Sequence, residues 1–339
     1  MDINPTMRIG LKQVLFFLLL IPWLIGLYGC TPELKTVSTE YSESFDDPVS
    51  YFMQAAQNNN VLTVMRFIEE GVVDVNQRDK TGRTAIMYAA MNGYLLLAEY
   101  LLSRKADLSL KDSWKYTAQM YAWENSQRDL VALILKHSSQ LDEKDLWGRS
   151  PLHLAICWGY HDLALWLMAQ KIDLNPQDNN GQTPLMSAVV CDSGDLLKDI
   201  LVKGANPDIQ DKDGNTALHL AIEYYRGEAI PVLLKQGARS DLFNLQEQTA
   251  LMKAVYYEYP DLVRLLLDNG ADLNVQNPSG ETALIIAVRS EQLELVKMLV
   301  QKGADLDPKD SNGDSALALA SEIWSPQTVK DMQNRFNGP

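Results

Sequence analysis

The sequence predicts an all-α solenoid of about nine helix-turn-helix units of 33 residues, with β-turn fingertips between units and degenerate caps at both ends. A serine or threonine recurs every 33 residues, at Thr84, Thr117, Ser150, Thr183, Thr216, Thr249, Thr282 and Ser315. An alanine follows each of them by five residues, at Ala89, Ala122, Ala155, Ala188, Ala221, Ala254, Ala287 and Ala320. One further period back lie Tyr51 and Ala56, so a first unit lacks the hydroxyl residue but stays in phase.

Residues 1–29 have the layout of a secretory signal peptide. Arg8 and Lys12 precede an apolar run over residues 14–28, and a small residue and a cysteine follow it. The run is about 15 residues long and contains Pro22, whereas a membrane-spanning helix needs about 20 apolar residues. We therefore expect a signal that is removed rather than a permanent anchor.

The segment "LYGC", Leu27 to Cys30, resembles the bacterial lipobox. The resemblance implies cleavage after Gly29, which leaves Cys30 as an acylated N-terminus. Thr31 follows the cysteine. In this respect the sequence resembles lipoproteins that reach the outer membrane of a Gram-negative cell, which lack an aspartate at this position. The alternatives are a plain signal peptide with a stray cysteine and a short signal anchor.

Residues 30–45 form the expected lipid-bearing N-terminus and flexible tether. The segment is polar and has neither helical nor strand periodicity. A flexible chain of this length spans on the order of 20 Å. We expect the folded body to lie at the periplasmic face of the outer membrane, held there by the lipid.

Each unit contains a turn, a helix cap and two helices. We expect Gly270 to end one helix in the left-handed conformation and Gly280 to allow a positive φ in the following turn. Thr282 then stands at the N-cap of the first helix of the next unit. Lys115 and Glu247 replace the turn glycine in two units. No single unit can bury its leucines, so stacking of neighbouring units must bury them.

The phrases "SPLHLA" (150–155) and "TALHLA" (216–221), together with "GAD" and "GAN", resemble the ankyrin repeat. The resemblance implies a stack of paired antiparallel helices with protruding turns, concave on the side of the first helices and fingertips. The expected ankyrin-repeat domain covers residues 46–335, with a short C-terminal tail at 336–339.

The acidic composition argues against nucleic acid as a partner. The formal net charge is −14 and the isoelectric point is about 4.7, so the protein repels phosphate backbones. A basic or polar protein partner fits this charge better. We expect no small-molecule substrate and no cofactor.

The histidines predict neither a metal site nor an active site. His153 and His219 occupy the slot where the ankyrin family has a structural histidine that bridges turns. His153, Cys157 and His161 have the spacing of metal ligands on one helix, but Gly159 breaks that helix. Ser150 is a helix cap without a nucleophile elbow, and no phosphate loop or other catalytic motif occurs. We expect no enzyme activity, no catalytic residue and no bound metal.

Cys157 and Cys191 are the two thiols that remain if Cys30 is acylated. They lie on first helices of adjacent units, whose axes should be about 8–10 Å apart. A disulfide requires Cα atoms within about 7 Å. This comparison favours two free thiols and leaves a disulfide as the alternative.

Aromatic residues stand at slots that vary between units and that line the concave face in the ankyrin family. They are Trp114, Tyr116, Tyr121, Trp147, Trp158, Tyr224 and Tyr257. Tryptophan and tyrosine are enriched at binding hot spots, so this set predicts the partner-binding site. The alternative for each residue is sideways packing on a neighbouring turn.

These features predict a membrane-tethered ankyrin-repeat lipoprotein that binds a protein. In this respect the chain resembles membrane-tethered ankyrin lipoproteins that act as immunity proteins and neutralise lipase-type secreted effectors in Gram-negative bacteria. A toxin or effector is therefore the expected partner. The alternative is an envelope-stress accessory, or a scaffold that supports another periplasmic protein.

Overall fold

The computed structural model describes residues 47–336, and within this range it contains eighteen helices and no strand. The predicted all-α repeat architecture is therefore confirmed. The predicted signal peptide, Cys30 and the tether lie outside the described residues, as do residues 337–339 of the predicted tail.

The helices form nine consecutive pairs, as the 33-residue period predicts. The first helices are α2 (Pro48–Gln57), α4 (Ala85–Asn92), α6 (Ala118–Glu124), α8 (Pro151–Cys157), α10 (Pro184–Val190), α12 (Ala217–Glu223), α14 (Ala250–Tyr256), α16 (Ala283–Arg289) and α18 (Ala316–Ile323). The second helices are α3 (Val61–Glu69), α5 (Leu95–Ser103), α7 (Arg128–His137), α9 (His161–Ala169), α11 (Gly194–Val202), α13 (Ala229–Lys235), α15 (Pro260–Asp268), α17 (Leu293–Gln301) and α19 (Pro326–Gln333).

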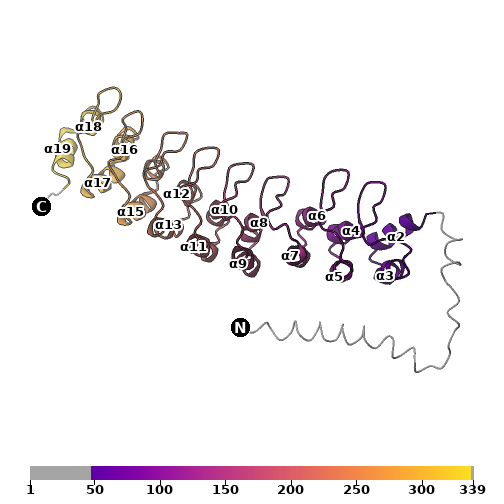
Figure 1. Cartoon of the computed structure of the whole chain (residues 1–339). Helices are drawn as coiled ribbons and strands as arrows, with labels where there is room; N and C mark the ends of the chain where they lie inside the picture. The colour runs from indigo at the N-terminus through magenta and orange to yellow at the C-terminus, as the bar shows by residue number, and fades with distance from the viewer. Residues whose placement is uncertain (1–46, 337–339) are drawn as a thin grey trace, which may run out of the picture. The chain divides into compact units, whose positions relative to one another are not determined.

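The nine pairs fall into two compact bodies, with the boundary between Leu130 and Val131 inside α7. We call the bodies before and after this boundary the first unit and the second unit, and each 33-residue helix pair a repeat. Within each unit the first helices form one layer and the second helices form another (Figure 1). The turn loops extend from the first-helix layer, away from the second helices (Figure 1). We call the surface made by the loops and the first helices the loop face of a unit.

The serine and threonine column caps the first helices, as predicted. Each of these residues is an N-cap with an extended backbone, and the hydroxyl of Thr249, for example, accepts the N–H of Met252 at 3.3 Å. The alanine column lies at the contacts between first helices, where all eight side chains are at most 1% exposed. A small side chain is required there because neighbouring helix backbones approach closely.

The turns adopt the left-handed backbone that the sequence predicts. Gly270 has φ +87° and Gly280 has φ +77°. A side chain at Gly280 would collide with the Lys309 carbonyl of the next loop, since an added Cβ would lie 2.7 Å from that oxygen. Lys115 and Glu247, which replace glycine at the corresponding turn position, keep a positive φ of 68° and 58°.

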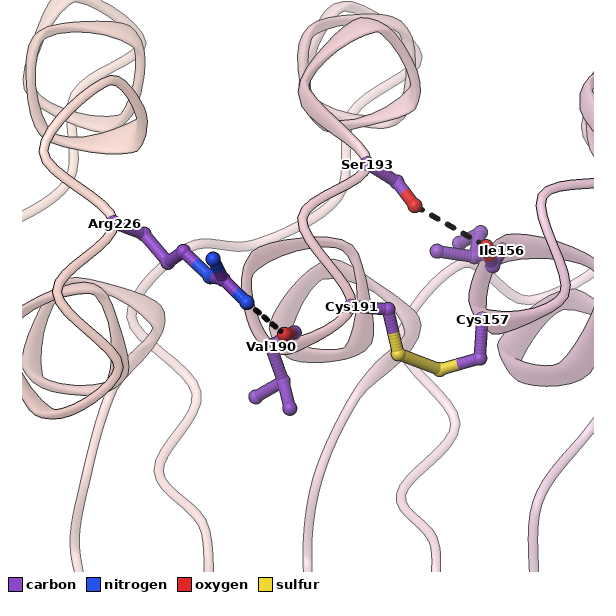
Figure 2. Close-up of a disulfide and its surroundings, with 6 residues drawn as sticks. All are labelled: Ile156, Cys157, Val190, Cys191, Ser193 and Arg226. Atoms are coloured by element: carbon purple, nitrogen blue, oxygen red, sulfur yellow. Dashed lines mark hydrogen bonds between the residues drawn. A yellow bond between two sulfur atoms is a disulfide. The ribbon is translucent and has the colours of Figure 1, made fainter.

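The expectation of free thiols at Cys157 and Cys191 is wrong, because the two residues form a disulfide with Cα atoms 5.2 Å apart (Figure 2). The axis-to-axis comparison misled because Cα atoms lie about 2.3 Å from a helix axis. Two Cα atoms on facing sides are therefore closer together than the axes. The bridge joins the ends of the adjacent first helices α8 and α10.

Between residues 47 and 336, no helix has both the length and the apolar character needed to cross a bilayer.

Candidate functional site

An acidic or amide side chain shapes each turn loop. In the loop before α8, one carboxylate oxygen of Asp145 accepts the N–H groups of Trp147 at 3.0 Å and of Arg149 at 2.8 Å. Asp112, Asp178, Asp211 and Asn244 do the same in their own loops. The residue two positions after this side chain is therefore held at the tip of its loop.

Neighbouring loops are joined by backbone hydrogen bonds. The N–H of Asn179 donates to the Trp147 carbonyl at 2.8 Å, and the N–H of Leu245 donates to the Asp213 carbonyl at 2.9 Å. These bonds fix the spacing of the tips without using the side chains of the tip residues. The side chains at the tips are left to face solvent or a partner.

Trp147 stands at such a tip in the second unit and is 54% exposed. Its ring centroid lies 4.8 Å from the guanidinium carbon of Arg149, which also forms a 2.8 Å ion pair with Asp145. The arginine thus supports one side of the indole and leaves the remainder accessible. Trp147 therefore stands exposed at a loop tip, where the sequence places it.

Trp114 has the corresponding position in the first unit and is 57% exposed. The guanidinium carbon of Arg83 lies 4.8 Å from its ring centroid and 5.5 Å from that of Tyr121. Arg83 also pairs with Asp112 at 3.6 Å and donates to the Tyr121 hydroxyl. Aromatic rings and a carboxylate therefore surround this arginine.

The structure removes Tyr121 from the predicted binding set. Tyr121 is buried, and its hydroxyl donates to a carboxylate oxygen of Asp112. Burial raises the pKa of this phenol, and so does its hydrogen bond to Asp112. Leu154 and Leu220 occupy the equivalent position in other repeats, and both are buried. A leucine at this position is the sequence signal that the side chain points inward.

Tyr116 is half-buried beside Tyr121, with the ring centroids 5.0 Å apart. Its hydroxyl donates to Glu124 at 2.7 Å, and this hydrogen bond to a carboxylate raises the pKa of Tyr116 to about 12. Of the three predicted binding residues in the first unit, Tyr116 and Tyr121 are thus engaged in contacts within the chain. Trp114 is the most exposed of the three.

The other predicted residues of the second unit lie where the first helices end. Trp158 is half-buried and its ring centroid lies 5.7 Å from that of Tyr160. Tyr224 and Tyr257 are exposed at the C-caps of α12 and α14. The sequence reasoning missed Tyr225, Tyr256 and Tyr259, which stand beside them. The runs "EYYR" and "YYEY" in adjacent repeats were the sequence signal for a tyrosine cluster.

The histidines have the structural role that the sequence predicts. The Nε2 atom of His219 donates to the Gln248 carbonyl at 2.9 Å, and its Nδ1 atom accepts the N–H of Thr216. His153 makes the equivalent bonds to the Gln182 carbonyl and Ser150. These roles need one proton per ring, and burial lowers the pKa of His219 to about 4.

His153, Cys157 and His161 do not lie on one helix, as the break at Gly159 predicts. His153 is on α8 and His161 begins α9, while Cys157 is in the disulfide. No group of three metal-ligating side chains occurs within the part of the chain that the structure describes.

The comparisons with known proteins agree with this architecture. A family model described as "Ankyrin repeats (3 copies)" matches residues 20–112, 52–145, 97–178, 119–201, 185–277 and 269–330. The crystal structure of the ankyrin repeat domain of Bcl-3, a member of the IkappaB protein family, is similar with 25% identity and a TM-score of 0.56. That likeness covers 75% of this chain and 100% of that one. No curated protein matches the chain. Repeats of this kind bind protein partners, and the fold is typically a scaffold without catalytic activity.

Proposed function

This chain belongs to the ankyrin-repeat family, and from that premise we propose that it is a lipid-tethered periplasmic module that binds a protein through its loop face. The observation that carries the proposal is that aromatic side chains are exposed on loops whose structure is held by other groups, namely the backbone and the Asp and Asn side chains. Trp147 is held by its backbone and by Arg149, and the residue is 54% exposed. Exposed tryptophan and tyrosine rings are the side chains that most often dominate protein interfaces.

The disulfide between Cys157 and Cys191 supports an exported location. Disulfides persist in oxidising compartments such as the bacterial periplasm and are rare in the cytosol. The layout of residues 1–29 and the "LYGC" segment point in the same direction. The proposed site is the periplasmic face of the outer membrane.

The most specific form of the proposal is an immunity or inhibitor role toward a lipase-type effector. It is supported by the resemblance to membrane-tethered ankyrin lipoproteins and by the net charge of −14, which favours a basic partner. A photoreactive amino acid at position 147 of the full-length chain tests it in living cells, with the same group at the exposed Val202 of α11 as control. A crosslink to an effector from position 147 alone supports the role. A crosslink to an envelope enzyme contradicts it, and the absence of any crosslink contradicts the binding module.

Replacing Cys30 with serine is expected to abolish acylation and to move the chain from the membrane fraction to the soluble periplasmic fraction. The physical reason is that the lipid supplies the membrane affinity, since the apolar signal is removed on export. The measurement is incorporation of a palmitate analogue together with fractionation. A variant with serine at both Cys157 and Cys191 is the control and should retain the label. A Cys30→Ser chain that stays in the membrane would exclude lipid anchoring.

A further inference from the structure

We propose that five tyrosines, at the ends of the first helices α12 and α14 and in the turns into the second helices α13 and α15, form a docking surface for arginine side chains of a basic protein segment. This tyrosine patch consists of Tyr224, Tyr225, Tyr256, Tyr257 and Tyr259. The inference rests on the proposed protein-binding function and names the chemistry of the partner.

The patch is a continuous aromatic surface made by two adjacent repeats of the second unit. The ring centroids of Tyr225 and Tyr259 are 5.0 Å apart, those of Tyr259 and Tyr257 are 5.6 Å apart, and those of Tyr257 and Tyr256 are 5.7 Å apart. Tyr256 is 61% exposed and Tyr225 is 54% exposed. The tyrosines orient one another and yet remain open to solvent.

Tyr225 occupies a backbone position that suits glycine. It follows the C-cap of α12 with φ +54°, and the same slot after α8 holds Gly159 with φ +69°. A bulky side chain in the left-handed region is strained, whereas glycine adopts it without penalty. The same slot holds Asn59, Ser126, Asp192, Glu258 and Glu291 in other repeats, all with φ between +55° and +58°, so the aromatic ring and not the backbone sets Tyr225 apart.

Lys253 and Arg226, the cations nearest the patch in the sequence, are each paired with a carboxylate, and the Lys253 Nζ atom also lies 5.9 Å from the Tyr257 ring centroid. Lys253 is 4% exposed, and its Nζ atom donates to Glu223 at 2.7 Å and to the Asn215 side chain. Arg226 extends toward the Val190 carbonyl beside the disulfide (Figure 2) and pairs with Asp192 at 3.0 Å.

Two carboxylates close to the tyrosines in the sequence have no such partners. Glu258 lies between Tyr257 and Tyr259 in the sequence, and Glu228 begins the turn into α13. Both are exposed, and neither forms an ion pair with any residue in the described range 47–336. Aromatic faces and free carboxylates together attract a guanidinium group through cation–π contacts and charge-assisted hydrogen bonds.

The first unit shows that this chain holds an arginine with the same groups. Arg83 lies against the rings of Trp114, Tyr121 and Tyr88 and pairs with Asp112. The tyrosine patch offers comparable rings and carboxylates without an arginine of its own. We therefore assign the missing cation to the partner.

The test titrates the full-length chain with a six-residue peptide of alternating glycine and arginine, and with the same peptide carrying citrulline in place of arginine. Citrulline keeps the shape of arginine and lacks its charge. We expect the citrulline peptide to bind about fivefold more weakly or worse. Equal binding of the two peptides, or no binding of the arginine peptide, would overturn the proposal.

The variant Tyr225→Gly locates the binding. We expect it to weaken arginine-peptide binding by about fivefold or more while its unfolding midpoint stays equal or rises, because the backbone strain is relieved. Ser126→Gly is the matched control, since Ser126 has φ +55° in the same slot of the first unit. Unchanged binding by Tyr225→Gly would place the peptide elsewhere on the acidic surface, and an equal loss in Ser126→Gly would assign the effect to the backbone. Neither outcome affects the crosslinking test of the proposed function.

Discussion

Replacing Cys157 and Cys191 with serine is expected to lower the free energy of unfolding by roughly 3–4 kcal/mol. The bridge closes a loop with a sequence separation of 34, and a crosslink of this span reduces the conformational freedom of the unfolded chain. The helix pairs of α8 and α10 contact each other and their neighbours within the second unit, so the loss should be concentrated in the repeats around α8 and α10. Urea denaturation of the wild type and the double variant measures the difference.

A reductant supplies the internal control for this prediction. Adding it to the wild type should reproduce most of the loss, whereas the double serine variant should show no response. A wild-type urea midpoint that is unaffected by a reductant would mean that the two sulfurs are not bonded, or that the bond does not constrain the unfolded chain.

Stability is expected to fall as the pH is lowered from about 6.5 to about 4, with His219 contributing about 3 kcal/mol of the loss. Burial is the main cause of the low pKa of His219, and the nearby Lys253 adds to it. The unfolded chain therefore binds a proton in this pH range before the folded chain does. This favours unfolding as the pH falls, and the full contribution is present above about pH 6.5.

The variant His219→Met isolates this contribution, because methionine occupies the same slot at Met87, Met186 and Met252. Met186 shows how the slot is filled without a titrating group, since its sulfur accepts the N–H of Thr183 at 3.4 Å. The variant loses the bond to the Gln248 carbonyl, at a cost of about 1 kcal/mol near neutral pH. Its unfolding free energy should depend less on pH than that of the wild type. Identical pH profiles would show that His219 does not titrate on unfolding.

The frame of this protein was predictable because its information is periodic. The hydroxyl cap seen at Thr249 recurs in every repeat but the first, and the buried alanine seen at Ala254 recurs in all nine, so each repeat supports the interpretation of the next. Departures from the pattern were harder to interpret. Lys115 and Glu247 keep the left-handed turn, in which their N–H groups donate to the carbonyls of Asp112 and Asn244 within the same loop.

The candidate site was predicted less well, because its properties depend on distances within one surface. Tyr121 was expected to face outward, but the carboxylate of Asp112 holds its hydroxyl inside. Tyr225 was not predicted as part of the site, because the sequence of one repeat does not show that its ring contacts Tyr259 of the next repeat. The Cys157–Cys191 bridge was underestimated because helix-axis separation does not set the distance between facing Cα atoms.

The central claim is that exposed aromatic residues of the loop face bind a protein, and the most direct measurement is the affinity of Trp147→Ala for the crosslinked partner. The control is Val202→Ala, which removes an exposed apolar side chain from α11 in the second-helix layer of the same unit. We expect Trp147→Ala to weaken binding by about 2 kcal/mol, roughly 30-fold, with circular dichroism and the unfolding midpoint unchanged. Val202→Ala should bind like the wild type. A folded Trp147→Ala protein that binds with wild-type affinity, alongside a weakened Val202→Ala, would contradict the claim and move the site to the second-helix layer.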